Sequence, residues 1–421
     1  MFIKRCLSLH KWKIKMLNIV ILNGGRGAAA IIPALLSRQG LHVTSVVNAY
    51  DDGKSTGEIR RFFGMLGPSD IRKVQELMLP QDDPDYQANL NAFRFRFPDG
   101  ITHPEAVSQL QAFATGQSEE LTGSLFSSEK IRVALRTFVR AFLAGLQSIE
   151  KVRGDRFNFS DCSIMNCLYA GAFLVFNRNF EEATLFFDRL FKLRGTVLPN
   201  SIEDKQLVAI RENGHMLYCE SDIVELRSNV LVDRIYLLDK SLDRQCFERL
   251  TFEEKHYYLE RHHCFVAVSP RVRLALEQAD IIIYSAGTQH SSLYPTYLSA
   301  GLSESIADNN TALKVFVTNI GADYETPTYK ASDYIKGAHR YLNLSDNRKY
   351  SMQELFDVIL INQSNNKSDE TYVEVDEEEL NNIPVQRLID DFESPYTTGK
   401  HDGAKIVTTI LELHEKFDLM E

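Results

Sequence analysis

The sequence predicts an α/β protein with a Rossmann-like, three-layer α/β/α core, a mainly parallel sheet and a helical insertion. Two apolar runs, at 17–22 and 280–284, end in glycine-containing turns, as strands buried on both faces of a parallel sheet do. A helical pattern and a β-branched run, 43–48, follow the first of them, which predicts a right-handed βαβ unit. Two such regions in one chain predict the two halves of one sheet.

Length and composition limit the function. The chain has 421 residues, of which 44% are apolar and 25% charged, which is ordinary for a globular protein and excludes wholesale disorder. Its net charge of −10 has the wrong sign for a protein that coats nucleic acid or anionic lipid. No apolar run of the sequence approaches the roughly 20 residues of a membrane span. We therefore expect a small-molecule ligand and no nucleic-acid or membrane partner, with a homodimer left open.

The cysteines and the first residues bear on the compartment. Six cysteines without CxxC spacing indicate neither a zinc ribbon nor a disulfide framework, which favours a reducing, cytoplasmic location. Basic residues precede the apolar run 17–22, as in an export signal, but that run is short and continues into the polar turn 23–27. We therefore interpret residues 1–15 as a disordered or frayed leader.

The rest of the chain divides by the same patterns. We expect residues 16–79 to form the first half of the core, 80–156 the helical insertion, 157–362 the second half with a β-hairpin, 363–382 an acidic segment of low order, and 383–421 a C-terminal segment with a closing helix. The expected helices are 28–37, 131–149, 161–176, 180–193, 271–279, 292–306 and 404–417, and the further expected strands are 206–210 paired with 215–219, 264–268 and 314–319.

The turn after the first strand, Asn23 to Gly27, is a candidate phosphate site. Its glycines, Gly24, Gly25 and Gly27, would let the backbone approach a phosphate, and the following helix would direct its N-terminal amides at the charge. Arg26 would add a cation or point to solvent. The alternative is a turn needed only for close packing of strand and helix. The turn is not a GxGxxG fingerprint, which disfavours an NAD dehydrogenase.

The loop after the second strand, 48–57, concentrates polar side chains. Asp51 and Asp52 could hold a divalent cation, orient a sugar hydroxyl or take a proton from an attacking alcohol. The alternative is an Asx turn that caps the next helix. The string Gly53–Thr56 superficially resembles a P-loop, but Asn48 stands where the first glycine is required, which disfavours a Walker-type ATPase.

Two further turns carry candidate ligand residues. Asp70 lies in a turn before a helix, where capping its own helix explains it as well as ligand binding does. The turn 285–292 mirrors the first glycine turn, and its hydroxyls and amides could bind a second phosphate or a base. His290 lies in that turn, but a single loop histidine is more often incidental than catalytic. His262 and His263 lack metal partners at a recognisable spacing, so we assign them no role.

Taken in order, these turns resemble those of the 2-phospho-L-lactate transferase (CofD-like) family, closest to its gluconeogenesis factor (YvcK-like) branch. The resemblance spans most of residues 17–415 and is specific through the order of its motifs, each of which is loose alone. The similar segments are 23–27 (GGGTG in the family), 51–60 (DDGGSSGRLR), 64–72 (GxLPPGDIR), 163–166 (a helix with Gly-Asn), 194–199 (RGRVLP) and 285–295 (GPGSLYTSxxP).

The resemblance implies a nucleotide diphosphate or nucleotide-sugar held between the two glycine turns. Transferase members move a phospho-lactyl or phospho-enolpyruvyl group from a guanosine diphosphate donor to a deazaflavin hydroxyl, usually with Mg²⁺, whereas the gluconeogenesis factors bind nucleotide-sugars. The resemblance to this family would make Asp51 and Asp52 a catalytic base or Mg²⁺ ligands. It places at the ligand Gly24, Gly25, Arg26, Gly27, Ser55, Thr56, Gly57, Asp70, Arg72, Asn166, Gly287, Thr288, Ser291 and Ser292.

Four departures from the family pattern fall in these loops. Arg26, Lys54, Met165 and Ala286 replace a threonine, two glycines and a proline. The added cations could suit a more highly phosphorylated ligand or record a lost activity. Two hypotheses follow, a nucleotide-binding regulator of carbon or cell-envelope metabolism and a Mg²⁺-dependent transferase, and the departures favour the regulator.

Overall fold

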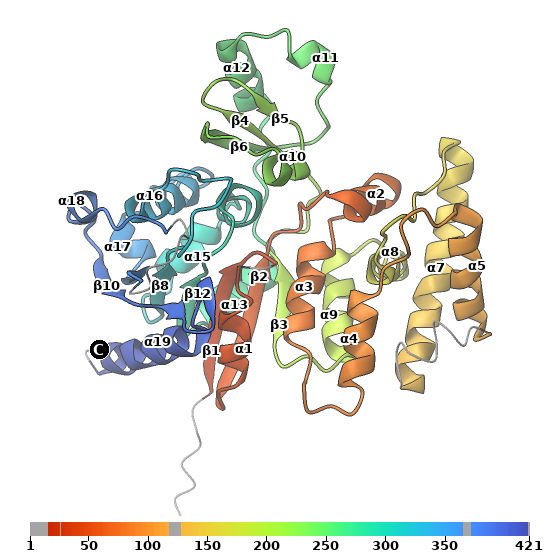
Figure 1. The fold of residues 1–421 in the computed structure, drawn as a ribbon, viewed down its shortest axis with the longest axis horizontal. Coiled ribbons are helices and arrows are strands. Elements are labelled where there is room, and N and C mark those ends of the chain that lie inside the picture. The colour runs from red at the N-terminus through yellow and green to blue at the C-terminus, as the bar shows by residue number, and fades with distance from the viewer. Residues whose placement is uncertain (1–15, 26, 118–127, 365–371, 420–421) are drawn as a thin grey trace, which may run out of the picture.

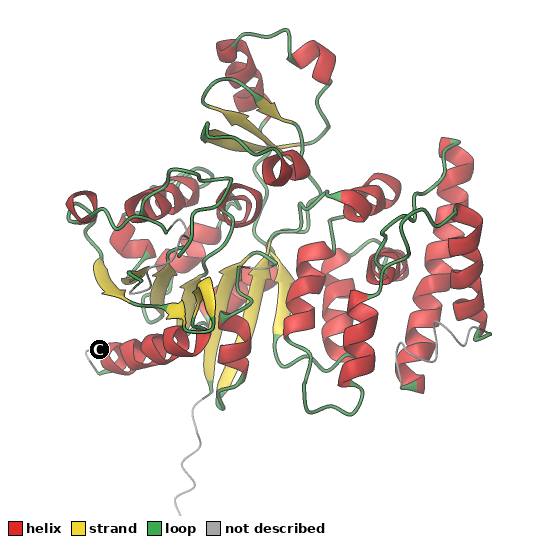
Figure 2. Cartoon of the chain, viewed as in Figure 1, coloured by secondary structure: helices red, strands yellow, loops and turns green. Residues whose placement is uncertain are grey.

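The computed structural model describes residues 16–25, 27–117, 128–364 and 372–419, so the expected leader 1–15 and Arg26 lie outside the described residues. The described residues form three sheets, which can be followed in Figures 1 and 2. Their strands are β1 (Leu17–Asn23), β2 (Leu41–Val47), β3 (Thr196–Pro199), β4 (Gln206–Arg211), β5 (Met216–Leu217), β6 (Val232–Leu238), β7 (Ile281–Tyr284), β8 (Leu313–Val317), β9 (Val358–Asn362), β10 (Gln386–Asp390), β11 (Glu393–Ser394) and β12 (Thr397–His401).

The main sheet has seven strands in the order β10-β9-β8-β7-β1-β2-β3, and every neighbouring pair is parallel. The predicted α/β fold with a mainly parallel sheet is therefore confirmed. The central strands β1 and β7 are almost fully buried because both are continuous apolar runs covered by helices on each side. The chain extends the sheet from β1 toward β3 and later from β7 toward β10. Strand order thus reverses between β1 and β7, where open α/β sheets form a crevice at the carboxyl ends.

Helices cover both faces of this sheet (Figure 2). On one face α1 packs against α19 at backbone distance, because a Cβ on Gly403 would clash with the carbonyl of Ala30. The described helices are α1 (Ile31–Leu36), α2 (Lys54–Phe63), α3 (Ser69–Leu77), α4 (Tyr86–Arg94), α5 (His103–Thr115), α7 (Glu129–Arg153), α8 (Ile164–Val175), α9 (Phe180–Leu190), α10 (Glu220–Glu225), α11 (Arg244–Phe247), α12 (Phe252–His262), α13 (Pro270–Glu277), the π-helical turn η1 (Gln289–Leu293), α14 (Tyr294–Tyr297), α15 (Leu302–Asp308), α16 (Ala331–Leu342), α17 (Met352–Leu355), α18 (Glu377–Leu380) and α19 (Gly403–Asp418).

The chain between β2 and β3 is helical, from α2 to α9, and forms the right-hand part of Figure 1. Its longest helix, α7, buries the apolar stripe of Leu135, Phe138, Phe142 and Leu146 that its sequence predicts. Helices α7 and α8 cross at backbone distance, since a Cβ on Gly171 would clash with the carbonyl of Phe138. This packing holds α8 and the loop before it against α2.

A small lobe, residues 206–262, lies beyond the carboxyl edge of the main sheet, at the top of Figure 1. The predicted antiparallel pair is confirmed as β4 and β5, joined by the Asn213-Gly214 turn, with Gly214 at φ +81°. The sequence analysis missed β6, which pairs with the other side of β4 and completes a sheet with its own apolar core. Helix α10 connects this lobe to η1 on the main body.

Some expected elements differ from the structure. The strand expected at 264–268 is reduced to one bridge, Ala267 to Ala300, and the helix expected at 292–306 is divided into η1, α14 and α15, with Gly301 at φ +83° before α15. Strands β3, β9, β10, β11 and β12 were also missed. Of the acidic segment 363–382, residues 365–371 lie outside the described residues, and 377–380 form α18. None of the described helices is long and apolar enough to cross a membrane.

Candidate functional site

The candidate site lies at the carboxyl edge of the main sheet, where the turns after β1 and β7 meet. A Cβ on Gly24 would lie 2.7 Å from Cβ and Oγ of Ser292, and a Cβ on Gly27 would lie 2.8 Å from Cα of Gly287. No side chain other than hydrogen fits at either position without movement of the neighbour. The two glycine turns thus lie directly against each other, as the pairing of β1 with β7 requires.

Asn48 fixes the loop after β2 to the same place. It is fully buried, and its Nδ2 donates to the carbonyl oxygens of Ser291 (3.1 Å) and Ser292 (3.0 Å). Its Oδ1 accepts from the amide of Tyr50 at 2.8 Å. One side chain therefore joins the loops after β2 and β7 across β1. The sequence analysis named Asn48 only as a mismatch to a P-loop glycine and missed this role.

Asp51 and Asp70 lie side by side next to the first glycine turn. Asp51 accepts from the amide of Gly53 at 2.9 Å, while Asp70 pairs with Lys73 at 2.7 Å. A Cβ on Gly25 would lie 2.8 Å from Cγ of Asp70, so that carboxylate contacts the turn itself. Burial, and then the charge of Asp70, raise the pKa of Asp51 above its usual value, although Lys73 opposes this.

Asp52 points to the small lobe. Its carboxylate accepts from the amides of Ser221 (3.0 Å) and Glu220 (3.4 Å), so it caps the start of α10. The Asx-turn alternative fits Asp51, whose Oδ1 accepts from the amide of Gly53 directly before α2, whereas Asp52 caps a helix distant in the chain. The first residue of α10, Glu220, is brought to the carboxylate pair, where burial and the charges of Asp51 and Asp70 raise its pKa well above its usual value.

Glu325 closes the other side of the site. It is 3% exposed, and its carboxylate accepts from the amides of His290 (2.8 Å) and Ser291 (3.0 Å) and from the hydroxyl of Ser291 (2.5 Å). Burial, and then the charge of Asp323, raise its pKa to about 8. The carboxylate of Glu325 thus occupies the amides of His290 and Ser291, which the sequence analysis had predicted to be available to a phosphate of the ligand. The hydroxyl of Thr288 links Ser291 (3.0 Å) to Ser292 (2.8 Å).

Ser55, Thr56 and Asn166 form a second polar group at the start of α2. Asn166 Nδ2 lies 3.2 Å from the hydroxyl of Ser55 and 3.5 Å from that of Thr56, and its Oδ1 is buried without a partner among the described residues. The close approach of Gly57 to the carbonyl of Asp52 holds α2 against the loop that precedes it. The structure therefore brings together three residues, Ser55, Thr56 and Asn166, that the family resemblance places at the ligand.

Arg72 is hydrogen-bonded to helix α4. Its Nη1 donates to the carbonyl of Phe93 at the end of α4 at 2.6 Å, and burial lowers its pKa from the usual value. This hydrogen bond is structural, because it satisfies a carbonyl at a helix terminus. Gly287 is likewise held by protein groups, since Asn319 accepts from its amide at 2.9 Å and donates to its carbonyl at 3.0 Å.

Burial raises the pKa of the carboxyl groups of Asp51, Glu220 and Glu325, which lie around the turns at this edge of the sheet. Carboxyl groups in such surroundings hold a proton more strongly than usual, and carboxylate oxygens are also the ligands that Mg²⁺ prefers. Within the described part of the chain, however, no three His, Cys, Asp or Glu side chains converge closely enough to hold a metal ion. Asp51 and Asp52 in particular turn toward different partners. The carboxylate oxygens are suitable ligands for Mg²⁺. The described residues nevertheless do not form a preformed metal-binding site.

Comparison with known proteins identifies the family of this chain. The sequence pattern of the 2-phospho-L-lactate transferase CofD family matches residues 19–392. The chain belongs to the CofD family. A relative of this CofD-family chain, named "Gluconeogenesis factor", from Listeria innocua is 23% identical over 405 residues, which are 94% of this chain and 95% of the relative. A protein of Thermotoga maritima is also 23% identical over 405 residues, 94% of this chain and 98% of its own length.

Solved structures agree with the fold of this CofD-family chain. Two crystal structures of a Bacillus halodurans protein, described as a member of the UPF0052 family, superpose with a TM-score of 0.65 at 20% identity. They cover 94% of this chain and 100% and 99% of their own. The resemblance to this family and to its gluconeogenesis factor relatives is therefore confirmed, and at this identity the solved structures bear on the fold alone.

Proposed function

We propose that this CofD-family chain binds the diphosphate of a nucleotide or nucleotide-sugar at the two glycine turns and acts as a cytoplasmic regulator of carbon or cell-envelope metabolism. The observation that carries the proposal is the contact of the turns after β1 and β7 at the point where strand order reverses. Backbone can approach a phosphate closely there because the glycines present no side chains. The similarity to a protein named gluconeogenesis factor supports the regulatory branch.

The hydrogen bonds that two predicted site residues make to other protein groups also favour ligand binding over catalysis. Asp52, one of the two candidate catalytic carboxylates, caps α10 through the amides of Ser221 and Glu220. Ser291 gives its amide and its hydroxyl to Glu325. Groups used in this way hold the small lobe and the β7 turn in place. A ligand that binds between the small lobe and the β7 turn would then contact both of them.

A thermal-shift titration tests this proposal. We expect guanosine, uridine or adenosine diphosphate, or a sugar derivative of one of them, to raise the unfolding temperature of the wild-type protein. Gly25→Ala should abolish that increase, because the added methyl would lie 2.8 Å from Cγ of Asp70 and must displace this carboxylate beside the turn. The flexible carboxylate can move, so the ligand-free variant should unfold near the wild-type temperature. Equal stabilisation of variant and wild type by every nucleotide would contradict the proposal.

The raised pKa of Asp51 supports a second candidate function, a Mg²⁺-dependent transferase that moves a phospho-lactyl or phospho-enolpyruvyl group to a deazaflavin hydroxyl. A raised pKa makes the ionised carboxylate of Asp51 a stronger base toward the proton of an attacking hydroxyl. Asp51 would hold that proton while the glycine turns hold the diphosphate, and Mg²⁺, when bound, would neutralise its charge. Assay of the purified protein with guanosine diphosphate donors and deazaflavin decides this, and Asp51→Asn should lower any turnover by about 10²- to 10⁴-fold.

A further inference from the structure

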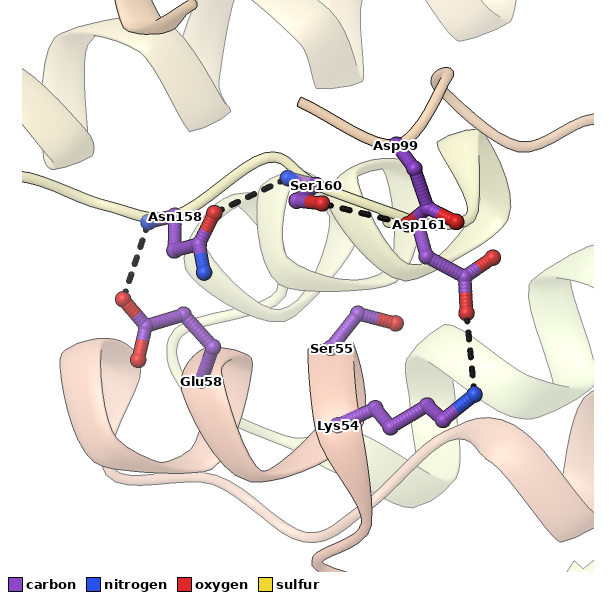
Figure 3. A pocket seen from close by; sticks show the side chains of 7 residues that line it. All are labelled: Lys54, Ser55, Glu58, Asp99, Asn158, Ser160 and Asp161. Atoms are coloured by element: carbon purple, nitrogen blue, oxygen red, sulfur yellow. Dashed lines mark hydrogen bonds and ion pairs between the residues drawn. The ribbon is translucent and has the colours of Figure 1, made fainter. Parts of the chain in front are cut away.

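A pocket of ≈ 290 Å³ lies between the first turn of α2, the segment that joins α4 to α5, and the loop before α8 (Figure 3). This volume is near the lower end of the range for small-molecule sites, about 300–1,000 Å³, so the pocket suits a small metabolite. Every residue that lines it is polar or charged. A ligand of this pocket must therefore be held by charge and hydrogen bonds rather than by apolar contact.

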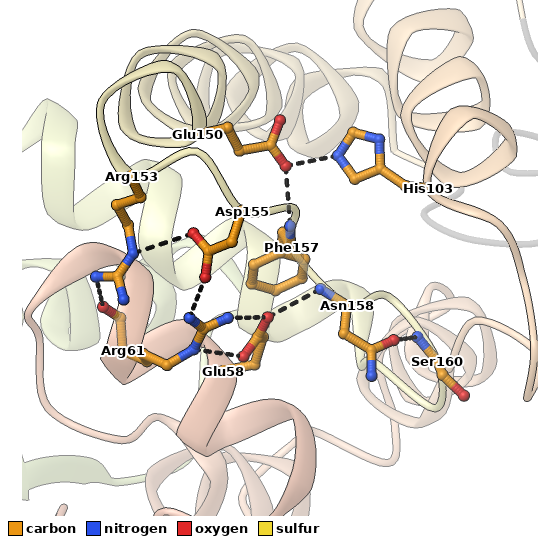
Figure 4. A network of polar contacts seen from close by, with 9 residues as sticks. All are labelled: Glu58, Arg61, His103, Glu150, Arg153, Asp155, Phe157, Asn158 and Ser160. Atoms are coloured by element: carbon orange, nitrogen blue, oxygen red, sulfur yellow. Dashed lines mark hydrogen bonds and ion pairs between the residues drawn. The ribbon is translucent and has the colours of Figure 1, made fainter.

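The carboxylate of Glu58, on one wall of the pocket, is already neutralised within the protein. It pairs with Arg61 at 2.9 and 2.8 Å and accepts from the amide of Asn158 at 2.9 Å. Asp155 joins the same Arg61 to Arg153, so α2 is tied to the segment after α7 (Figure 4). These contacts hold this wall in place, and the charge of Glu58 is not available to a ligand.

Lys54 supplies the pocket with a cation that its protein partner holds only weakly. Its ammonium lies 3.4 Å from Oδ2 of Asp161, and its side chain is 73% exposed, so this ion pair contributes little to stability. Asp161 is also paired with Arg96 at 3.3 Å, and it would keep that cation if Lys54 turned to a ligand. The family motif that this loop resembles has glycine at position 54, and Lys54 has a φ of +44°, which suits glycine. The cation is therefore a feature of this chain, present at some cost in backbone strain.

Asp99 provides a negative charge on the other side of the pocket (Figure 3). It lies at the exposed rim and accepts from the hydroxyl of Ser160 at 3.2 Å. Two cations compensate Asp161, but no lysine, arginine or histidine in the described part of the chain forms an ion pair with Asp99. A positively charged group of a ligand can therefore pair with Asp99 without displacing a protein cation.

Two neutral donors also face the pocket. Ser55 is 5% exposed and accepts from Nδ2 of Asn166 at 3.2 Å, and among the described residues no acceptor takes its own hydroxyl proton. Oδ1 of Asn158 accepts from the amide of Ser160 at 3.0 Å, and its Nδ2 points into the pocket (Figure 3). A buried hydroxyl with an unused proton is a group that an oxygen atom of a ligand would satisfy.

We propose that this pocket binds a free α-amino acid with a polar side chain, in its zwitterionic form. The carboxylate of the amino acid accepts from Lys54 and Ser55, its ammonium donates to Asp99, and Asn158 donates to its side chain. An acid without the ammonium leaves Asp99 without a partner, and an amine without the carboxylate leaves Lys54 and Ser55 unused. An apolar side chain finds no apolar wall. The inference does not depend on diphosphate binding at the glycine turns, because neither turn lines the pocket.

Isothermal titration tests this with L-serine, L-asparagine and L-glutamine, each compared with the amine that lacks its carboxylate and the acid that lacks its ammonium. For serine these are ethanolamine and 3-hydroxypropionate. We expect at least one of the three amino acids to bind the wild-type protein with a Kd below about 1 mM. Both of its truncated analogues should bind at least about tenfold more weakly, because each loses a charged hydrogen bond.

Two variants locate the binding. Asp99→Asn and Lys54→Gly should each weaken binding of that amino acid by at least about fivefold, because each removes one of the two charges. Lys54→Gly should unfold near the wild-type temperature, since relief of the positive φ offsets the added freedom of glycine in the unfolded chain.

A matched control is Asp82→Asn, which changes an exposed carboxylate that pairs with Arg194 and does not line the pocket, and it should leave every affinity unchanged. Failure of all three amino acids to bind with a Kd below about 1 mM overturns the proposal. Equal binding of the amine or the acid and its parent amino acid also overturns it, because the pocket would then recognise one charge only. Unchanged affinity in Asp99→Asn or in Lys54→Gly refutes the assignment of these charges to the ligand.

Discussion

Replacing Gly27 by alanine measures how closely the two glycine turns are packed. A Cβ at this position would lie 2.8 Å from Cα of Gly287 and closer still to the carbonyl oxygen of Ala286. Two carbon atoms in contact prefer about 3.5–4.0 Å, so the turns must separate by nearly 1 Å. The obstructing atoms belong to the backbone of a turn that follows a buried strand, so they cannot rotate away. We expect a loss of about 1–3 kcal/mol of stability, as in other overpacked sites.

Gly287 provides the matched control from the other side of the same contact. A Cβ on Gly287 would lie 3.5 Å from Cα of Gly27, an ordinary contact distance, and its φ does not require glycine. Gly287→Ala should therefore unfold at nearly the wild-type temperature, whereas Gly27→Ala should unfold several degrees lower by differential scanning calorimetry. Equal unfolding temperatures for Gly27→Ala and wild type, or equal losses in both variants, would refute the packing that we describe.

Two further predictions concern buried carboxylates. Because the pKa of Glu325 is raised to about 8 from its ordinary 4.5, the folded state holds a proton that the unfolded state releases, and its contribution to stability falls as pH rises from about 4.5 to 8. Glu325→Gln keeps an acceptor for the amides of His290 and Ser291 without the charge, so the unfolding temperature should depend less on pH over that range; an unchanged profile would contradict the assignment. Asp52→Ala removes the cap of α10 and should cost about 1 kcal/mol. Amide hydrogen exchange of 220–225 should then accelerate more than that of the distant helix α19, and uniform acceleration would argue against a local role.

The buried strands of the centre were predictable because their chemistry is local. The runs that form β1, β2, β7 and β8 are apolar and β-branched, and each ends in a turn, which is the pattern of a strand buried on both faces. Strand β3 has four residues and β10 is partly exposed at the sheet edge, so neither run gives that pattern. Strand β9 does have it, with the sequence VILIN, and the signal was available but missed.

The division of the helix expected at 292–306 shows where local pattern gives way to packing. Its residues are apolar at helical spacing, and η1, α14 and α15 all bury their faces. Gly301 at φ +83° nevertheless ends the run, and Ala300 pairs with the segment at Val266 instead. The sequence shows a glycine at position 301, which tolerates a positive φ. It does not show that the segment at Val266 pairs with Ala300 there.

The turns that carry glycine, hydroxyl and carboxylate groups at the ends of buried strands were predictable from the sequence, because each is a property of a short segment. The use of those groups depends on contacts between segments that are distant in the chain. Strand order places β1 beside β7, so two turns far apart in the chain pack at backbone distance. The fold also brings Glu220 and Glu325, to which the sequence analysis gave no role in the site, to the turns after β2 and β7. Their proton affinities arise from burial and neighbouring charge, which no local pattern of residues encodes.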